Sequence, residues 1–228
     1  MAKEKKNSRP FSRAMLAPVL FFLTGCAVQP VVDAGLTLDS PEHVKAVRTV
    51  LLHGDWLVAR GIHVPDNLVA SLTNMPLSHA AIFDADNEGV IEADSTGVHP
   101  TPLADFLAKH QRVLVIRPIW SSPENSAVAV ERARSWVGKG YNYTGLVGLN
   151  VVPDRYYCTQ VAVFAYKPFM KERPENPIPN IIKPGQMYHW GRIIYDSGPI
   201  SGLSLAPGSG TGSDPSSDQT AFDEEDQD

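Results

Sequence analysis

Residues 155–166 read RYYCTQVAVFAY, where a polar, aromatic turn passes into an apolar run at Cys158. The composition of 159–166 predicts a helix buried on most sides, which Lys167-Pro168 is expected to end. A thiol in the first turn of such a helix lies beside backbone N–H groups that have no partner within the helix. Their partial positive charge favours the thiolate, the reactive form of cysteine. Cys158 is therefore a candidate nucleophile, and a buried structural cysteine is the alternative.

Residues 1–25 have the composition of a lipoprotein signal peptide. Five basic residues precede a nine-residue apolar run over 15–23, broken only by Pro18. That run is shorter than the roughly 20 apolar residues that span a bilayer, and it fits a signal-peptide core. The run closes on Leu23-Thr24-Gly25-Cys26, which resembles the lipobox of bacterial lipoproteins. We therefore expect Cys26 to be lipidated and to become the new N-terminus, anchoring the protein to the membrane on the periplasmic side of the cell envelope. The residue after Cys26 is not Asp, which favours the outer membrane.

The net charge and the cysteine count reduce the number of function classes that the sequence allows. The leader carries five basic residues and Glu4, so its removal takes the formal charge from −5 to −9. No basic stripe remains, which argues against binding to nucleic acid or other polyanions. With Cys26 lipidated, Cys158 has no partner in a compartment where thiols usually pair. An unpaired thiol there is a liability unless it is buried or used, and this favours the nucleophile interpretation.

The rest of the chain predicts one domain with a flexible segment at each end. We expect a tether over 26–40, a single domain of about 160 residues over 41–197, and a disordered acidic tail over 198–228. The expected helices begin at Pro41 and span 67–72, 101–107 (with a cap) and 125–137. The expected strands are 56–59, 113–117 and a hairpin of 78–83 with 90–94. A loop is expected at 138–143, and after the last helix a proline-rich segment is expected to wrap the core with apolar anchors that include Ile193.

A thiol nucleophile needs a base and a third polar group that orients the base. Among the seven histidines, His79 stands out because it opens an otherwise apolar strand, where a polar ring needs a partner. Its hairpin neighbour supplies an acid in either of two registers: a loop at 84–87 places His79 opposite Glu92, and a loop at 85–88 places it opposite Asp94. A structural His–acid pair is the alternative. The other histidines lack a telling partner or spacing: His43, His53, His63, His99, His110 and His189.

No HxxxH or CxxC spacing is present, so we expect neither a metal site nor a cofactor.

Five short motifs together resemble the circularly permuted NlpC/p60 papain-like enzymes, and within them the YiiX-like (YebB-like) branch. They are Gly54-Asp55-Trp56, Ser78-His79-Ala80-Ala81-Ile82, Val90-Ile91-Glu92-Ala93, Gly140-Tyr141-Asn142 and Tyr157-Cys158-Thr159-Gln160-Val161. The resemblance covers about residues 50–167 and preserves the branch's order of His, Glu and Cys. It implies an α+β fold in which an antiparallel sheet or small barrel packs against helices, with the nucleophile at a helix N-terminus.

The same resemblance implies the roles of the site residues. Cys158 corresponds to the nucleophile, His79 to the base and Glu92 to the group that orients His79, with Asp94 as the alternative third residue. Tyr157 is a candidate oxyanion donor and Tyr141, with Tyr143, a candidate lining of the cleft. Packing is the alternative role for each tyrosine.

Three functions follow as hypotheses. The first is a monomeric cysteine peptidase or amidohydrolase that cleaves peptidoglycan stem peptides. The second is a hydrolase or acyltransferase acting on lipid-linked amide or ester bonds. The third is a non-catalytic binding lipoprotein with the same fold.

Overall fold

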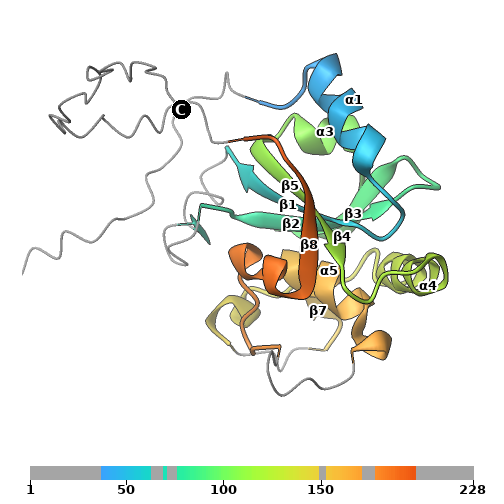
Figure 1. Cartoon of the computed structure of the whole chain (residues 1–228). Helices are drawn as coiled ribbons and strands as arrows, with labels where there is room; N and C mark the ends of the chain where they lie inside the picture. Colours follow the sequence, from blue (N-terminus) through green and yellow to red (C-terminus); the bar gives the residue numbers. More distant parts are fainter. Residues whose placement is uncertain (1–36, 63–68, 71–75, 149–152, 171–177, 199–228) are drawn as a thin grey trace, which may run out of the picture.

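The computed structural model describes residues 37–62, 69–70, 76–148, 153–170 and 178–198 (Figure 1). The predicted leader with Cys26, most of the tether, most of the helix expected at 67–72 and nearly all of the acidic tail lie outside these residues. Among the residues described, no helix is long and apolar enough to cross a membrane.

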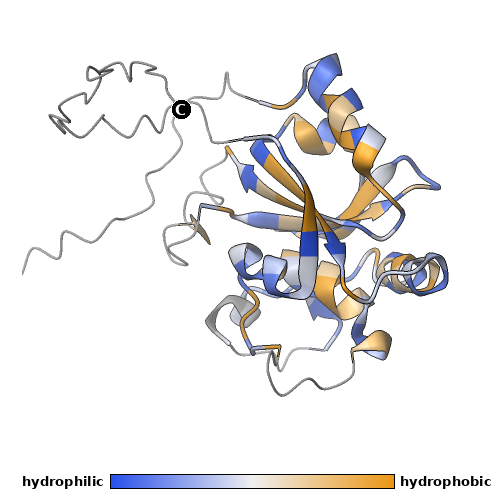
Figure 2. Cartoon of the chain, viewed as in Figure 1, coloured by the Kyte–Doolittle hydropathy of each residue, from blue (hydrophilic) through white to orange (hydrophobic). Residues whose placement is uncertain are grey.

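A six-stranded antiparallel sheet forms the centre of the fold, with strand order β4-β3-β2-β1-β5-β8. Its strands are β1 (Trp56–Gly61), β2 (His79–Asp84), β3 (Gly89–Asp94), β4 (Gly97–Pro102), β5 (His110–Pro118) and β8 (Gly191–Asp196). The central strands are buried, β1 along its whole length and β2 from its second residue onward, and Figure 2 shows hydrophobic residues in the strands of the sheet and in the helices that pack on it. A separate parallel pair joins β6 (Gly140–Tyr141) to β7 (Arg155–Tyr156).

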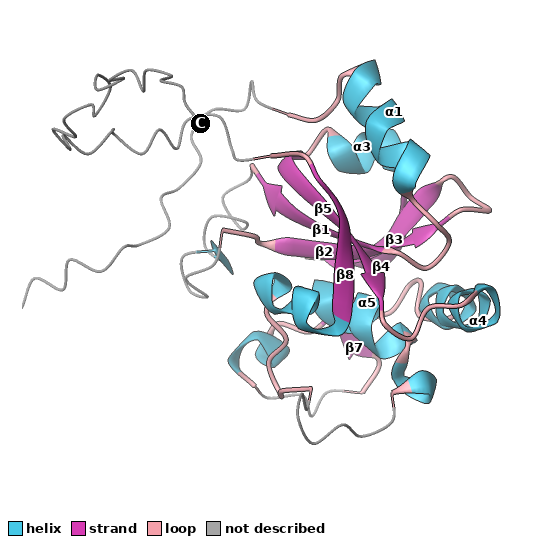
Figure 3. Cartoon of the chain, viewed as in Figure 1, coloured by secondary structure: helices cyan, strands magenta, loops and turns pink. Residues whose placement is uncertain are grey.

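Helices cover both faces of the sheet (Figures 1 and 3). Helices α1 (Pro41–Val50) and α3 (Leu103–Leu107) pack on one face, where they share a core cluster with the sheet. Helices α4 (Pro123–Arg134) and α5 (Cys158–Ala165) pack on the other face with the 3-10 helix η3 (Pro184–Trp190). Two further 3-10 turns, η1 (Thr144–Val147) and η2 (Lys167–Phe169), flank α5 in the chain. The predicted α+β class with an antiparallel sheet and packed helices is confirmed.

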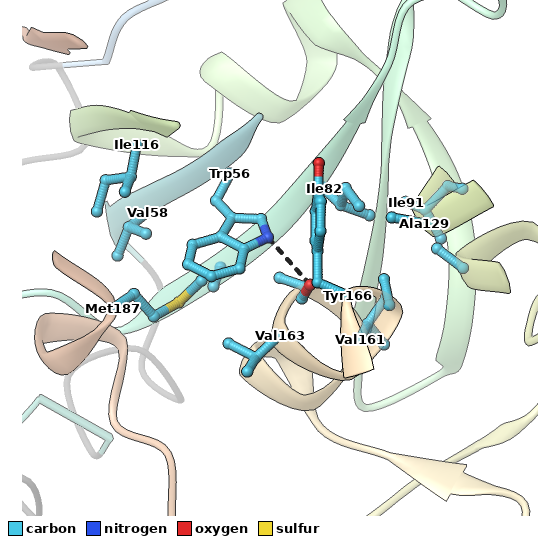
Figure 4. Close-up of a cluster of buried hydrophobic side chains, with 14 of the residues drawn as sticks. Trp56, Val58, Ile82, Ile91, Ile116, Ala129, Val161, Val163, Tyr166 and Met187 are labelled. Atoms are coloured by element: carbon cyan, nitrogen blue, oxygen red, sulfur yellow. Dashed lines mark hydrogen bonds between the residues drawn. The ribbon is translucent and has the colours of Figure 1, made fainter. Parts of the chain in front are cut away.

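Trp56 links α5 to the sheet. Its side chain is fully buried among Val58, Met187 and Tyr166, and its Nε1 donates a hydrogen bond to the Ala162 carbonyl at 3.0 Å (Figure 4). At the far end of α5, the Tyr166 hydroxyl donates to the Gly54 carbonyl at 3.0 Å. These two bonds fix the helix against β1 and thereby fix the position of its first residue, Cys158.

The structure corrects the prediction at both edges of the sheet. The residues expected to start a capped helix at Thr101 end strand β4 instead, and α3 begins at Leu103 without a side-chain cap. The segment expected to wrap the core ends in an edge strand, β8, where Ile193 is 48% exposed rather than an apolar anchor. The loop expected at 138–143 contains the two-residue strand β6.

Candidate active site

Cys158 is the first residue of α5 and is 4% exposed, with a free thiol. The turn before it is held by two buried amides. Gln160 Oε1 accepts the Tyr157 N–H at 3.1 Å and an N–H of the Asn142 side chain at 3.3 Å. Asn142 in turn accepts the Gly145 N–H at 2.9 Å. The Gly140-Tyr141-Asn142 motif therefore braces the helix start that presents the thiol.

His79 lies between Cys158 and Glu92. Its Nε2 is 2.5 Å from Glu92 Oε2, and its ring forms a side-chain hydrogen bond with Cys158. An ionised carboxylate can only accept, so Nε2 carries the proton that Glu92 holds. In the neutral ring the lone pair is therefore on Nδ1, which leaves Nδ1 to receive the thiol proton. The three side chains form one hydrogen-bonded chain.

Glu92 is buried and accepts a second hydrogen bond. The Thr101 hydroxyl donates to Glu92 Oε1 at 2.6 Å, and Lys109 Nζ lies 3.9 Å from the same oxygen. Burial raises the pKa of Glu92, but the His79 ring, the Thr101 hydroxyl and the nearby His110 lower it, and the balance brings it to about 2. Glu92 is therefore ionised at neutral pH.

The contact with Glu92, which lowers the pKa of that carboxyl group, raises the pKa of His79. Burial lowers the pKa of His79, but hydrogen bonds with Cys158 and Glu92 and electrostatic attraction to both outweigh burial. The pKa of His79 therefore lies well above its usual value, which favours the imidazolium form beside Cys158.

The hairpin register corrects how His79 reaches Glu92. The Cα register pairs Ala81 with Glu92 and Asp84 with Gly89, so the loop is 85–88 rather than 84–87. Continued to His79, this register points to Asp94, yet the ring contacts Glu92, its diagonal neighbour on the same face. A glutamate side chain is long enough to span a diagonal pair. Of the two predicted registers the structure has the second, but His79 makes the contact that was predicted for the first.

The predicted alternatives lie elsewhere. Asp94 Oδ1 accepts the Thr96 N–H, and its Oδ2 lies 3.1 Å from His99 Nε2. The Tyr157 ring is 1% exposed and its hydroxyl accepts the Ile182 N–H, which favours packing over an oxyanion role. Tyr141 is close to Cys158: burial and then the neighbouring Cys158 raise its pKa. The lining role of Tyr141 stays a prediction.

Sequence reasoning missed His110 and Thr101. His110 has no telling partner or spacing in the sequence, but it is buried at the start of β5 and stacks on the His79 ring with 5.5 Å between centroids. Its Nδ1 donates to the Phe106 carbonyl at 2.6 Å, which fixes the ring. Phe106 also contacts the His79 ring, at 5.9 Å between centroids. The alternation of polar and apolar residues in 97–102 was the one available signal for Thr101.

One group in the described part of the chain has metal-ligand composition: His53, Asp84 and Asp86, whose ligand atoms lie within 4.8 Å of one another. His53 Nδ1 accepts the Ala85 N–H, so the neutral ring carries its proton on Nε2 and has no free lone pair. Arg134 already binds both Asp84 and Asp86. The guanidinium therefore satisfies the charge that a cation would neutralise.

Comparison with known proteins shows the family of the chain. A family model described as "permuted papain-like amidase enzyme, YaeF/YiiX, C92 family" matches residues 62–178. The chain belongs to this family. The matched segment includes His79, Glu92 and Cys158, and the family's description makes the protein a papain-like hydrolase.

A solved structure is also similar to the chain: the crystal structure of metalloprotein YiiX from Escherichia coli O157:H7, at 21% identity and a TM-score of 0.45 over 54% of this chain and 69% of that one. The search of curated proteins found no match.

Proposed function

We propose that the protein is a thiol amidohydrolase with Cys158 as nucleophile, His79 as general base and Glu92 as the group that orients His79. One observation carries the proposal: a thiol at a helix N-terminus hydrogen-bonds an imidazole whose other nitrogen is held by a buried carboxylate. Family membership supports the reaction class. A merely structural His–Glu pair would not need a thiol at its open nitrogen.

In the proposed mechanism His79 Nδ1 takes the proton of the Cys158 thiol, and the sulfur attacks the carbonyl carbon of an amide. The carbonyl oxygen becomes an oxyanion, which the N–H groups at the start of α5, including that of Cys158, stabilise. The imidazolium then returns its proton to the leaving amine as the C–N bond breaks. Water, deprotonated by His79, hydrolyses the resulting thioester and regenerates the thiol.

We propose peptidoglycan stem peptides as the substrate. A lipid anchor at Cys26, as the leader predicts, would hold the domain beside the cell wall, whose amides are the abundant local substrate. Charged and polar groups lie on the Glu92 side of the triad, with Lys109 near Glu92 and His99 beside Asp94, and we take them as support for a peptide rather than an acyl chain.

The substrate is tested by incubating the purified chain with muropeptides and, separately, with lipid amides and esters, followed by mass spectrometry. We expect the mass changes of amide hydrolysis in the muropeptides only. Cleavage of lipid substrates alone would replace the wall-peptide proposal with the lipid one.

The mechanism is tested with three variants and a control. Cys158→Ala and His79→Ala should abolish turnover, a loss of about 1,000-fold or more. Glu92→Gln should reduce turnover less, because its amide still occupies the position beside His79 Nε2. His43→Ala is the matched control, since His43 is exposed and pairs with Ser40. Unchanged turnover in Cys158→Ala would refute the mechanism.

A further inference from the structure

The hydrogen-bonded chain of the site does not stop at Glu92. The Thr101 hydroxyl, which donates to Glu92 Oε1 at 2.6 Å, lies 3.2 Å from His99 Nδ1. On the other side of that ring, His99 Nε2 lies 3.1 Å from Asp94 Oδ2. The line of hydrogen bonds from Cys158, His79 and Glu92 therefore extends to His99, and Asp94, whose side chain is 40% exposed, lies beside the outer nitrogen of that ring without a hydrogen bond.

The sheet places these groups on one face. The register of β3 and β4 sets Glu92 directly opposite His99 and Val90 opposite Thr101, so Thr101 is diagonal to Glu92. Thr101 is 5% exposed, and its hydroxyl therefore depends on these neighbours for its hydrogen bonds. β4 is the edge strand, which is why it accommodates Pro100 and Pro102.

The donors along the line can be assigned from chemistry. Glu92 is an acceptor, so the single Thr101 proton points to it and the hydroxyl lone pairs face His99. His99 Nδ1 must then carry a proton, and it also lies 3.4 Å from the Pro100 carbonyl, which can only accept. His99 Nε2 lies 3.1 Å from Asp94 Oδ2 but makes no hydrogen bond there, so Asp94 is a neighbour of the ring rather than its hydrogen-bond partner. The hydrogen bonds of the line therefore run from His99 through Thr101 to Glu92.

Glu92 has few other constraints on its position. The groups that face it are His79 from β2, Thr101 from β4, and Lys109 and His110 at the start of β5. Lys109 is 3.9 Å away and its side chain is 44% exposed, which makes it a weak restraint. Besides His79 itself, the Thr101 hydroxyl is therefore the group that fixes the carboxylate.

We infer that Thr101 and His99 are positioning residues for the proposed reaction: Thr101 fixes Glu92, and His99 fixes Thr101. The inference rests on the proposed function, because it assumes that the orientation of His79 matters to Cys158. It also leaves Asp94 beside the outer end of the line rather than as the partner of His79. A purely structural Thr101 would affect stability and leave the reactivity of Cys158 unchanged.

The test uses iodoacetamide as the probe and the full chain, with alkylation of the Cys158 peptide followed by mass spectrometry from pH 5 to 9. Thr101→Val keeps the shape and removes the hydroxyl, and we expect alkylation at pH 6 to fall about tenfold, the effect of one hydrogen bond to a charged group. Thr101→Ser restores the hydroxyl and should return the rate to within about twofold of the wild type. Thr49→Val is the matched control, because Thr49 is exposed and bonds only the Lys45 carbonyl.

A second measurement tests the contact between His99 and Thr101. It also decides the question if the Thr101→Val variant fails to fold. His99→Ala leaves Thr101 in place, and we expect the proton NMR signal of His79 Nε2 to shift and alkylation to slow about threefold. If Thr101→Val is unfolded by circular dichroism, His99→Ala alone decides.

Wild-type reactivity at every pH in folded Thr101→Val, or an unshifted signal with an unchanged rate in His99→Ala, overturns the inference and leaves the proposed function intact. A wild-type Cys158 that reacts no faster than glutathione at pH 6 overturns the proposed function, and this inference with it.

Discussion

At the scale of single residues, the site depends on the electrostatic coupling of Glu92 and His79. The carboxylate at 2.5 Å stabilises the imidazolium, and the imidazolium in turn keeps the carboxylate ionised. The pKa of each group therefore moves away from that of its partner, which is the arrangement that allows one group to stay ionised while the other exchanges a proton.

This coupling predicts the alkaline limit of activity. The proposed mechanism needs the imidazolium as the acid that protonates the leaving amine, so activity falls as pH rises through the pKa of His79. Because that pKa is raised well above 6.5, the wild type should stay active above neutral pH. Glu92→Gln removes the negative charge, and the alkaline limb should move to lower pH by about one unit or more. A limb at the same pH in both proteins, measured by turnover from pH 5 to 10, would contradict the role of Glu92.

The same carboxylate predicts an acid-sensitive contribution to stability. The pKa of Glu92 is lowered from 4.5 to about 2 in the folded chain, so its contribution is fully present above pH 4.5 and is lost as pH falls towards 2. The shift corresponds to about 3 kcal/mol. Urea unfolding at pH 7 and pH 3 should show a larger acid loss in the wild type than in Glu92→Gln. Glu42→Gln, at an exposed residue of α1, should behave as the wild type.

At the scale of elements, the position of Cys158 depends on how α5 is attached to β1. Tyr166 is fully buried at the end of α5, where its hydroxyl bonds the Gly54 carbonyl and lies 2.9 Å from Ser126 Oγ. Tyr166→Phe leaves both groups without this partner, and the free energy of unfolding should fall by about 1–3 kcal/mol. Tyr188→Phe, at a residue that is 51% exposed, is the control and should change stability by less than about 0.5 kcal/mol. Equal stability of the two variants in urea would show that this attachment contributes little.

The central elements could be predicted because their patterns are local. The apolar run after Cys158 and the apolar run after His79 each indicate one element, and both elements form where expected. The edge strands β4 and β8 could not be identified in this way. The prolines of β4 are typical of turns, and an edge strand tolerates them only because one of its sides makes no ladder bonds, a property of the whole sheet.

The candidate site, like the fold, could be predicted only where a local sequence pattern indicates it. Residue types and motif order indicated Cys158, His79 and Glu92, which the fold brings together. Thr101, His99 and His110 were missed because each depends on strand register: the two histidines have no telling partner in the sequence, and Thr101, before an apolar run, was predicted to begin a capped helix. Register is set by pairing across the sheet, and no local pattern near these residues reports it.

At the scale of the whole molecule, the fold brings the candidate catalytic residues together, and the predicted lipid would hold the protein at the membrane. Acyl chains contribute about 0.8 kcal/mol of membrane binding for each buried CH₂ group, so a lipidated Cys26 would hold the domain firmly at the envelope. We predict that the mature protein begins at Cys26, carries acyl chains detectable by mass spectrometry, and fractionates with the outer membrane.

Cys26→Ala tests this placement, because it removes the lipid acceptor and leaves the catalytic residues unchanged. We expect the variant to lose the acyl mass and to keep its leader, since processing at a lipobox follows lipidation of its cysteine, while Cys158 alkylates at the wild-type rate. Cys158→Ala is the matched control, which should retain the acyl mass and lose turnover. A wild-type protein that starts at another residue and carries no lipid would remove the reason for proposing the cell wall as the site of action, and the triad would still require its own test.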